Sequence, residues 1–363
     1  MGMPPLVAVT HSQLILEEGF EPALLACAEL LLLHGADANG SRINPRWPDS
    51  PLSALYGAAG RTHNAAMTRL LLKTGANPDD NESLYHSVES RDRTCTRLLL
   101  DAGARVAGTN AIGRVLDYGR LEDLKLMLQH GEDAKERPWI HHAILRGRTL
   151  AHIRMLIDAG ADLRAVNRDG ISLSRWAQMH GRGDVVDILR SAGIEDPLTD
   201  GEQFIAACSR GDEAAARALQ QQIPDIFSRL TPAQLQALPE LADLGDLRAV
   251  RTMLEVGWPR EVKAAWNATA LNLAVYRGDS QMAELLLSYG ADWTTIHGFG
   301  GNVVGALSYA SQTDIEDPSA PRDYVGCARV LIAHGVPLPN NRHNTFSPEV
   351  TAYFDTLRLR NPG

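Results

Sequence analysis

Short runs of leucine at helical spacing, each followed by a glycine, recur along the chain. Clear copies occupy residues 31–35, 70–75, 98–103 and 285–290. Leucines three and four positions apart form one apolar face of a helix. A glycine after the last turn adopts the left-handed conformation that ends a helix at little cost. The pattern therefore predicts a series of short amphipathic helices, each ending at a glycine.

A second pattern precedes each leucine run. Its best copy, residues 269–279, begins at Thr269, a residue type that caps helices, and ends at Gly278 and Asp279. Partial copies occupy residues 50–53, 83–86, 139–144 and 169–177. The two patterns together predict a pair of helices that repeats along the chain.

The glycine stops give the length of this repeat. A degenerate copy at 218–222 lacks the glycine but fills the gap between two stops. With this copy included, successive stops lie 28 to 45 residues apart. The glycines are Gly35, Gly75, Gly103, Gly131, Gly160, Gly193, Gly257, Gly290 and Gly335. Internal similarity at a period of about 20–50 residues indicates a stack of repeats rather than compact domains.

The two patterns resemble the ankyrin repeat family, whose unit of about 33 residues contains the phrases T-P-L-H and L-L-x-x-G-A-D. The resemblance covers nearly the whole chain and is strongest at 160–193 and 257–290. It implies an all-α fold, an ankyrin-repeat α-solenoid of about ten helix-pair units in which each unit packs on its neighbours. Units spaced by 28 or 29 residues are too short for a full β-hairpin finger, so we expect short turns there.

The match to the repeat varies along the chain. We predict N-terminal repeats over 1–194, degenerate repeats or a bend over 195–245, and C-terminal repeats with a cap over 246–363, in one continuous solenoid. The segment 195–245 could also be a weak seam between two stacks. Caps with polar outer faces are expected near 11–16 and at 348–359. The last interval predicts a longer finger at 298–302 and an insertion around 314–323.

Composition excludes several classes of protein. The 363 residues carry a formal charge of −9, which argues against a chain-wide basic patch for nucleic acid. The four cysteines form no C-x-x-C pair, which argues against a disulfide framework and a standard zinc site. No signal peptide or long apolar run is visible. These features favour a cytoplasmic protein, and the preference for arginine over lysine favours a bacterial source.

Candidate reaction centres are absent from the sequence pattern. There is no G-x-S-x-G, no H-E-x-x-H and no completed phosphate-binding loop. Cys27 and Cys95 fall beside leucines and are predicted to be buried, inert thiols. By resemblance, His86 and His141 would hydrogen-bond the backbone between neighbouring turns. We therefore predict a non-enzymatic protein with no cofactor and no metal; the alternative is an enzyme with a site hidden in 195–245 or 298–323.

The resemblance also implies where a partner would bind, because ankyrin stacks use finger tips and the exposed side of the first helix. The register places these candidates on that concave strip: Trp266, Tyr276, Arg277, Phe299 and Tyr309. Aromatic residues and arginine dominate binding energy at interfaces. The alternative for Trp266 is packing against the neighbouring finger. A further candidate, Trp47, lies in the insertion 42–50.

The predicted function is a protein–protein interaction module. The finer hypothesis is an inhibitor or immunity-type protein that masks a toxin or enzyme, and the alternative is a bacterial effector scaffold that acts on host proteins. We expect a monomer with a protein partner and no binding to nucleic acid or membranes. Two acidic clusters lie in predicted loops: Asp79, Asp80 and Glu82 form one, and Asp314, Glu316 and Asp317 form the other. Each cluster is either an ordinary solvated surface or a surface that attracts a basic partner.

Overall fold

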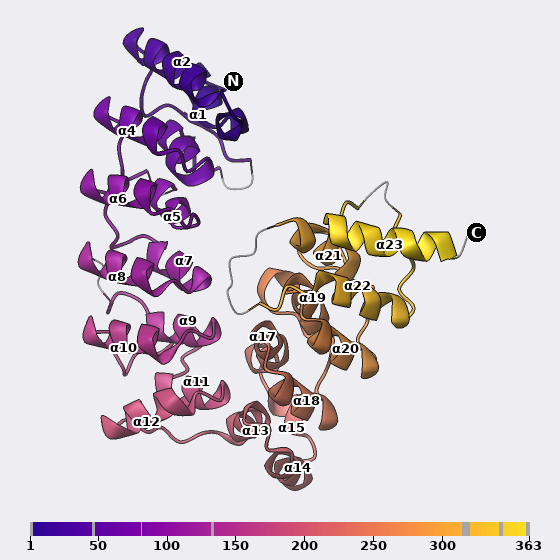
Figure 1. Cartoon of the computed structure of the whole chain (residues 1–363). Coiled ribbons are helices and arrows are strands. Elements are labelled where there is room, and N and C mark those ends of the chain that lie inside the picture. Colours follow the sequence, from indigo (N-terminus) through magenta and orange to yellow (C-terminus); the bar gives the residue numbers. More distant parts are fainter. Residues whose placement is uncertain are drawn as a thin grey trace. The chain divides into compact units, whose positions relative to one another are not determined.

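The computed structural model describes residues 3–45, 48–80, 82–131, 134–313, 320–340 and 344–360. These residues form two compact units (Figure 1). The first unit comprises residues 1–142 and 151–162, and the second comprises 143–150 and 163–363. We describe each unit by itself.

The first unit is built from short helices and one small strand pair. Its elements are α1 (Pro5–Thr10), the 3-10 turn η1 (Gln13–Leu16), α2 (Glu21–Leu33), β1 (Ser41–Arg42), β2 (Leu52–Ser53), α3 (Ala54–Tyr56), the π-helical turn η2 (Gly57–Arg61), α4 (Ala65–Lys73), α5 (Ser83–Ser87), α6 (Thr94–Asp101), α7 (Ala111–Tyr118) and α8 (Leu121–Gln129). Helices α9 (Trp139–Leu145) and α10 (Leu150–Asp158) contain the boundary between the units.

The second unit continues the alternation of helices. Its elements are α11 (Leu173–Met179), α12 (Gly183–Ser191), α13 (Asp200–Ser209), α14 (Glu213–Gln222), α15 (Ile226–Arg229), α16 (Pro232–Leu235), α17 (Ala237–Asp243), α18 (Leu247–Glu255), the 3-10 turn η3 (Ala265–Asn267), α19 (Ala270–Tyr276), α20 (Ser280–Ser288), α21 (Val303–Gln312), α22 (Tyr324–Ala333) and α23 (Pro348–Arg360).

These elements confirm the all-α prediction of about ten helix pairs, with glycine stops at the predicted positions. Gly75 illustrates the stop. Its φ of 93° is in the left-handed region; its N–H donates to the Leu72 carbonyl at 3.2 Å, and the Ala76 N–H donates to the Leu71 carbonyl at 3.0 Å. Two carbonyls at the end of α4 are thereby satisfied, as in a Schellman motif.

One register position carries the core of both units. The residue four positions before each glycine stop is 0–2% exposed from the second repeat onward; these residues are Leu71, Leu99, Met127, Leu156, Leu189, Met253, Leu286 and Leu331. Each belongs to the second helix of its pair. The interior is thus a row of aliphatic side chains shared between successive repeats.

The length of each finger follows from the repeat spacing, as predicted. Strands β1 and β2 pair antiparallel, with Ser41 opposite Ser53, in the long first connection. Single bridges join Val166 to Ser172 and Lys263 to Thr269. Repeats spaced by 28 or 29 residues are joined by turns without strand pairing in the part of the chain that is described.

The segment 195–245 forms regular helices despite its poor sequence match. Phe204 of α13 is fully buried and stacks on Trp258 at 5.7 Å between ring centroids, and Phe227 meets both rings edge-on. This aromatic cluster replaces the usual leucine and glycine pattern. The segment belongs to the continuous core of the second unit, and the boundary between the units lies at 143–162 instead.

The N-terminal end differs from its prediction. The first helix is α1 at Pro5–Thr10, while Gln13–Leu16 forms only a 3-10 turn. Helix α2 does not present a polar outer face, because Leu30 and Leu33 are 57% and 80% exposed. At the other end, the predicted C-terminal helix is present as α23, with Val350 and Phe354 buried.

Two predictions about individual side chains are wrong. Cys27 is exposed on α2 rather than buried. The other cysteines are buried, and burial raises the pKa of Cys208 to about 12. His86 contacts carboxylates rather than backbone: its Nδ1 lies 2.8 Å from Glu89 and its Nε2 lies 3.3 Å from Glu82. His141 is buried, as expected for a structural side chain.

The contacts of His86 predict a pH-dependent stability. Burial alone would lower the pKa of His86, but hydrogen bonds to Glu82 and Glu89 raise it from 6.5 to about 9. A raised folded-state pKa gives stability that is fully present below pH 6.5 and is lost as the pH rises through 9. His86→Gln should therefore lower the free energy of unfolding by on the order of 2 kcal/mol below pH 6.5, and by much less at high pH.

Urea unfolding of both proteins across this pH range checks the prediction. His130→Gln, which changes an exposed imidazole bonded to its own helix at Leu126, is the control. A difference between wild type and His86→Gln that does not change with pH would contradict a charged His86.

Candidate functional site

Four aromatic side chains of two successive repeats form a contiguous group on the second unit, which we call the aromatic surface: Trp266, Tyr276, Phe299 and Tyr309. Trp266 lies 5.6 Å from Tyr276 and 6.4 Å from Phe299 between ring centroids, and Tyr276 stacks on Tyr309 at 6.3 Å. Trp266, Phe299 and Tyr309 are 48%, 61% and 61% exposed. Tyr276 is half-buried at the centre of the group.

A short finger before α19 holds Trp266. The Ala264 N–H donates to the Ala268 carbonyl at 3.0 Å, next to the bridge between Lys263 and Thr269. To close this narrow turn, Trp266 and Asn267 both adopt φ of 56°. Such left-handed conformations are unusual for residues other than glycine, and they put the indole at the tip of the finger.

The next finger packs on the backbone of the first. The Gly298 N–H donates to the Trp266 carbonyl at 2.7 Å, and the His297 N–H donates to the Gly301 carbonyl at 2.8 Å. A Cβ atom at position 298 would lie 2.6 Å from the Trp266 carbonyl oxygen, so only glycine fits. This contact between two fingers holds Phe299 beside Trp266.

The two tyrosines come from first helices of neighbouring repeats. Thr269 and Asn272 form a capping box that starts α19, which carries Tyr276 as its last residue. The Asn302 side chain caps α21, which carries Tyr309. Because α19 packs directly against α21, the half-buried Tyr276 and the exposed Tyr309 lie on one face and stack.

Arg277 does not belong to this surface, contrary to the prediction. It is 5% exposed. The chain returning from the insertion crosses it, with the Arg322 N–H donating to the Arg277 carbonyl at 3.1 Å and the Asp323 N–H to the Gly278 carbonyl at 2.8 Å. Arg277 occupies a repeat position that is usually exposed to solvent. Here the segment that carries Arg322 and Asp323 covers it.

The other candidates have different outcomes. Trp47 lies outside the described residues, as do Asp314, Glu316 and Asp317. The acidic cluster in the first unit is engaged within the protein. The Arg105 N–H and guanidinium both donate to Asp79 at 2.7 Å, and the Ser83 hydroxyl donates to Asp80 at 2.6 Å. Glu82 pairs with His86.

Sequence reasoning missed two neighbours of the aromatic surface. Ile296 is 49% exposed, and the His297 ring lies 6.0 Å from Phe299. Burial lowers the pKa of His297 below its ordinary value. The signal for both was their sequence position immediately before the lengthened finger 298–302, which carries Phe299. Ile296 adds apolar area to the aromatic surface, and His297 adds an imidazole ring.

This arrangement of exposed aromatic side chains suits contact with another molecule. Among the described residues, no group of three or more His, Cys, Asp or Glu side chains is arranged to hold a metal ion. None of the described helices is both long and apolar enough to cross a membrane.

Comparison with known families identifies the repeat. The family model described as Ankyrin repeat matches residues 266–297, the unit that carries Trp266 and Tyr276. Residues 266–297 therefore match an ankyrin repeat. Ankyrin repeats are protein–protein interaction modules, so the coarse prediction from sequence is confirmed.

Curated ankyrin repeat proteins resemble part of this chain. "Ankyrin repeat and SOCS box protein 6" of Homo sapiens is 29% identical over 164 residues, which is 42% of this chain and 34% of that protein. The protein of the same name from Pongo abelii gives the same identity and coverage. The chain thus spans about a third of the length of these relatives.

Solved structures of ankyrin repeat domains also resemble the chain. The human ASB11 ankyrin repeat domain is 19% identical, with a TM-score of 0.29, covering 63% of this chain and 99% of that domain. An ankyrin repeat domain from Acinetobacter baumannii AYE is 16% identical, with a TM-score of 0.35, covering 52% of this chain and 96% of that domain.

The contact between the two fingers yields a prediction. Gly298→Ala should destabilise the protein by about 1–3 kcal/mol, because the added methyl group forces the Trp266 carbonyl away and breaks its hydrogen bond. Thermal unfolding monitored by tryptophan fluorescence measures this effect.

Gly305→Ala is the matched control. Gly305 lies inside α21 with open space where a Cβ would be, so this change should stabilise the helix by about 0.5–1 kcal/mol. Equal melting temperatures for wild type and Gly298→Ala would show that the fingers are not held as described.

Proposed function

We propose that this ankyrin repeat chain is a non-enzymatic protein-binding module and that its partner contacts the aromatic surface of the second unit. The observation that carries the proposal is the run of exposed aromatic rings at Trp266, Phe299 and Tyr309 across two repeats. Such residues supply most of the binding energy at protein interfaces.

The size of the surface supports the proposal. Each of the three exposed rings leaves about half of its area open, roughly 100 Å² each for side chains of this size. Covering about 300 Å² of this apolar area would contribute at most roughly 7 kcal/mol before the costs of association. Three rings can therefore anchor an interface whose remaining contacts are polar.

The backbone geometry also supports it. The left-handed conformation of Trp266 and the contact of Gly298 with its carbonyl hold the indole and Phe299 in place before any partner arrives. A surface that is already ordered loses little conformational entropy on binding. Trp266 does contact the neighbouring finger, yet about half of its side chain stays open.

The finer proposal is an inhibitor or immunity-type protein, cytoplasmic and bacterial, that masks a toxin or enzyme. Its support is the net charge of −9, which suits a basic target such as a nuclease. Loss of the target's activity when it is mixed with the purified chain tests this version. No effect on the product of the neighbouring gene would contradict it, and export into host cells would favour an effector instead.

The double variant Phe299→Ser with Tyr309→Ser tests the binding surface. Both side chains are mostly exposed, so the melting temperature should change by less than about 2 °C. Affinity capture with the wild-type chain defines the partner. The double variant should bind that partner at least about tenfold more weakly than the wild type, because hot-spot residues each contribute about 1–2 kcal/mol or more.

Val166→Ser is the control, because Val166 is 53% exposed on a different finger of the same unit. It should bind the partner as the wild type does. Undiminished binding by the double variant would exclude the aromatic surface as the contact site.

A further inference from the structure

A column of basic side chains runs along the outer face of the first unit. The residue six positions before the glycine stop is basic in four successive repeats: Arg69 on α4, Arg97 on α6, Lys125 on α8 and Arg154 on α10. We call these four residues the basic column. All four are exposed, and their helices follow one another in one layer of the first unit (Figure 1).

Helix geometry explains why this position faces outward. The fully buried position lies two residues further along the same helices, as in Leu71, Leu99 and Met127. Two residues rotate a helix by about 200°, so the two rows face nearly opposite directions. The basic column therefore belongs to the second-helix face, away from the finger tips and first helices of the repeats.

The charges of the column are available to a partner. None of its four side chains makes a hydrogen bond or ion pair with any described residue. This contrasts with Arg93, which pairs with the buried Asp123. Charges of mixed sign at this position would keep the protein equally soluble, so solubility alone does not require a run of cations.

The second unit shows that the repeat does not require a basic residue here. The same register position there is occupied by Asp187, Arg251, Glu284 and Arg329, so the sign alternates. The first repeat of the first unit carries Glu29 at this position. An unbroken run of four cations is thus a property of α4 to α10 and not of the repeat.

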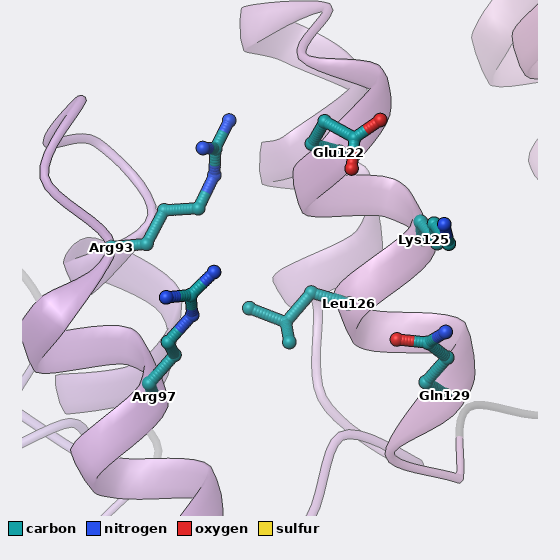
Figure 2. Close-up of a pocket in the computed structure, with 6 residues that line it drawn as sticks. All are labelled: Arg93, Arg97, Glu122, Lys125, Leu126 and Gln129. Carbon is teal, nitrogen blue, oxygen red and sulfur yellow. The ribbon is translucent and has the colours of Figure 1, made fainter.

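A notch between α6 and α8 lies at the centre of the column. Its volume is about 190 Å³. Arg97 and Arg93 extend into it from the side of α6, and α8 supplies Glu122, Lys125, Leu126 and Gln129 (Figure 2). Arg93 is paired with Asp123, so Arg97 and Lys125 are the cations of the notch that are open to a ligand, against one carboxylate, Glu122. An acidic side chain of a partner could be held here by Arg97 and Lys125 together.

The neighbouring rows define what kind of ligand would fit. Four residues after each member of the basic column, one helical turn closer to the glycine stop, the chain carries Lys73, Asp101, Gln129 and Asp158. Carboxylates therefore border the column and limit it to a narrow line. A narrow line of cations suits a single extended chain rather than a broad anionic surface.

We propose that the basic column is a second docking surface, on which the first unit binds an extended acidic segment of a partner protein. Packed helices lie about 8–10 Å apart, so successive cations of the column recur at about that interval. A chain in the extended polyproline II conformation rises about 3.1 Å per residue with three residues per turn, so acidic residues at every third position lie on one face at nearly the same interval. Each Asp or Glu would lie beside the column, and one of them would enter the notch between Arg97 and Lys125.

Nucleic acid and anionic membranes fit this surface less well. The carboxylates of Asp101 and Asp158 border the column and limit the room for a polyphosphate backbone, and the residues lining the notch include no aromatic ring on which a base could stack. The only apolar side chain lining the notch is Leu126, which offers little for insertion into lipid.

The test uses the full chain and a fluorescently labelled peptide of about twelve residues with Glu at every third position, enough to span the four cations. Fluorescence anisotropy should show saturable binding that weakens as ionic strength rises from about 0.05 to about 0.5 M. Arg97→Ala with Lys125→Ala should weaken binding by about tenfold. A peptide with Gln in place of Glu should not bind.

Arg251→Ala with Arg329→Ala is the matched control, because it removes two exposed cations from the same register of the second unit. Both double variants should melt at the wild-type temperature, and the control should bind the peptide as the wild type does. Equal loss in both variants, or no saturable binding, would overturn the proposal. Column-dependent binding of phosphatidylserine vesicles or single-stranded oligonucleotides without peptide binding would overturn it in favour of those ligands.

Discussion

The packing of one aliphatic side chain per repeat against its neighbours holds both units together. Leu71, Leu99, Leu156, Leu286 and their equivalents are almost completely buried because each inserts between successive helix pairs. A single pair of short helices cannot enclose a core, so stability comes from these shared interfaces. The glycine stops support this arrangement by ending each second helix at the same distance from its buried leucine.

This constraint also determines which positions of each repeat stay open on the surface. Positions that pack between repeats are fixed as apolar, while finger tips, first-helix ends and the outer face of the second helices stay open to variation. In the second unit, aromatic residues occupy finger and first-helix positions, as Trp266 and Tyr309 show. In the first unit, cations such as Arg97 occupy the outer face. The two surfaces differ in chemistry, so they would select different ligands.

The sequence predicted the periodic features well. Leucine spacing, glycine stops and the threonine cap at Thr269 act over a few residues, so the pattern alone predicts the helix pairs and the short fingers. The same register correctly placed Trp266, Phe299 and Tyr309 at exposed positions. Whether a partner binds there stays a prediction.

Features that depend on contacts between distant residues were not predictable. Arg277 is buried because residues 320–323 fold back over it. The local sequence pattern of α19 does not predict this contact. The helices of 195–245 are stabilised by Phe204 stacking on Trp258, a contact 54 positions apart in the chain. Hydrogen bonds to Glu82 and Glu89 raise the pKa of His86, whereas the sequence pattern placed Glu82 in a surface acidic cluster and predicted backbone contacts for His86.

Oxidative footprinting with mass spectrometry tests the central claim most directly. Hydroxyl radicals modify exposed aromatic rings, so Trp266, Phe299 and Tyr309 should be modified readily in the chain alone. All three rings should become protected when the chain is in complex with the protein that it captures, while the exposed Leu359 is modified as before. Unchanged modification of the three rings in a saturated complex would contradict the account.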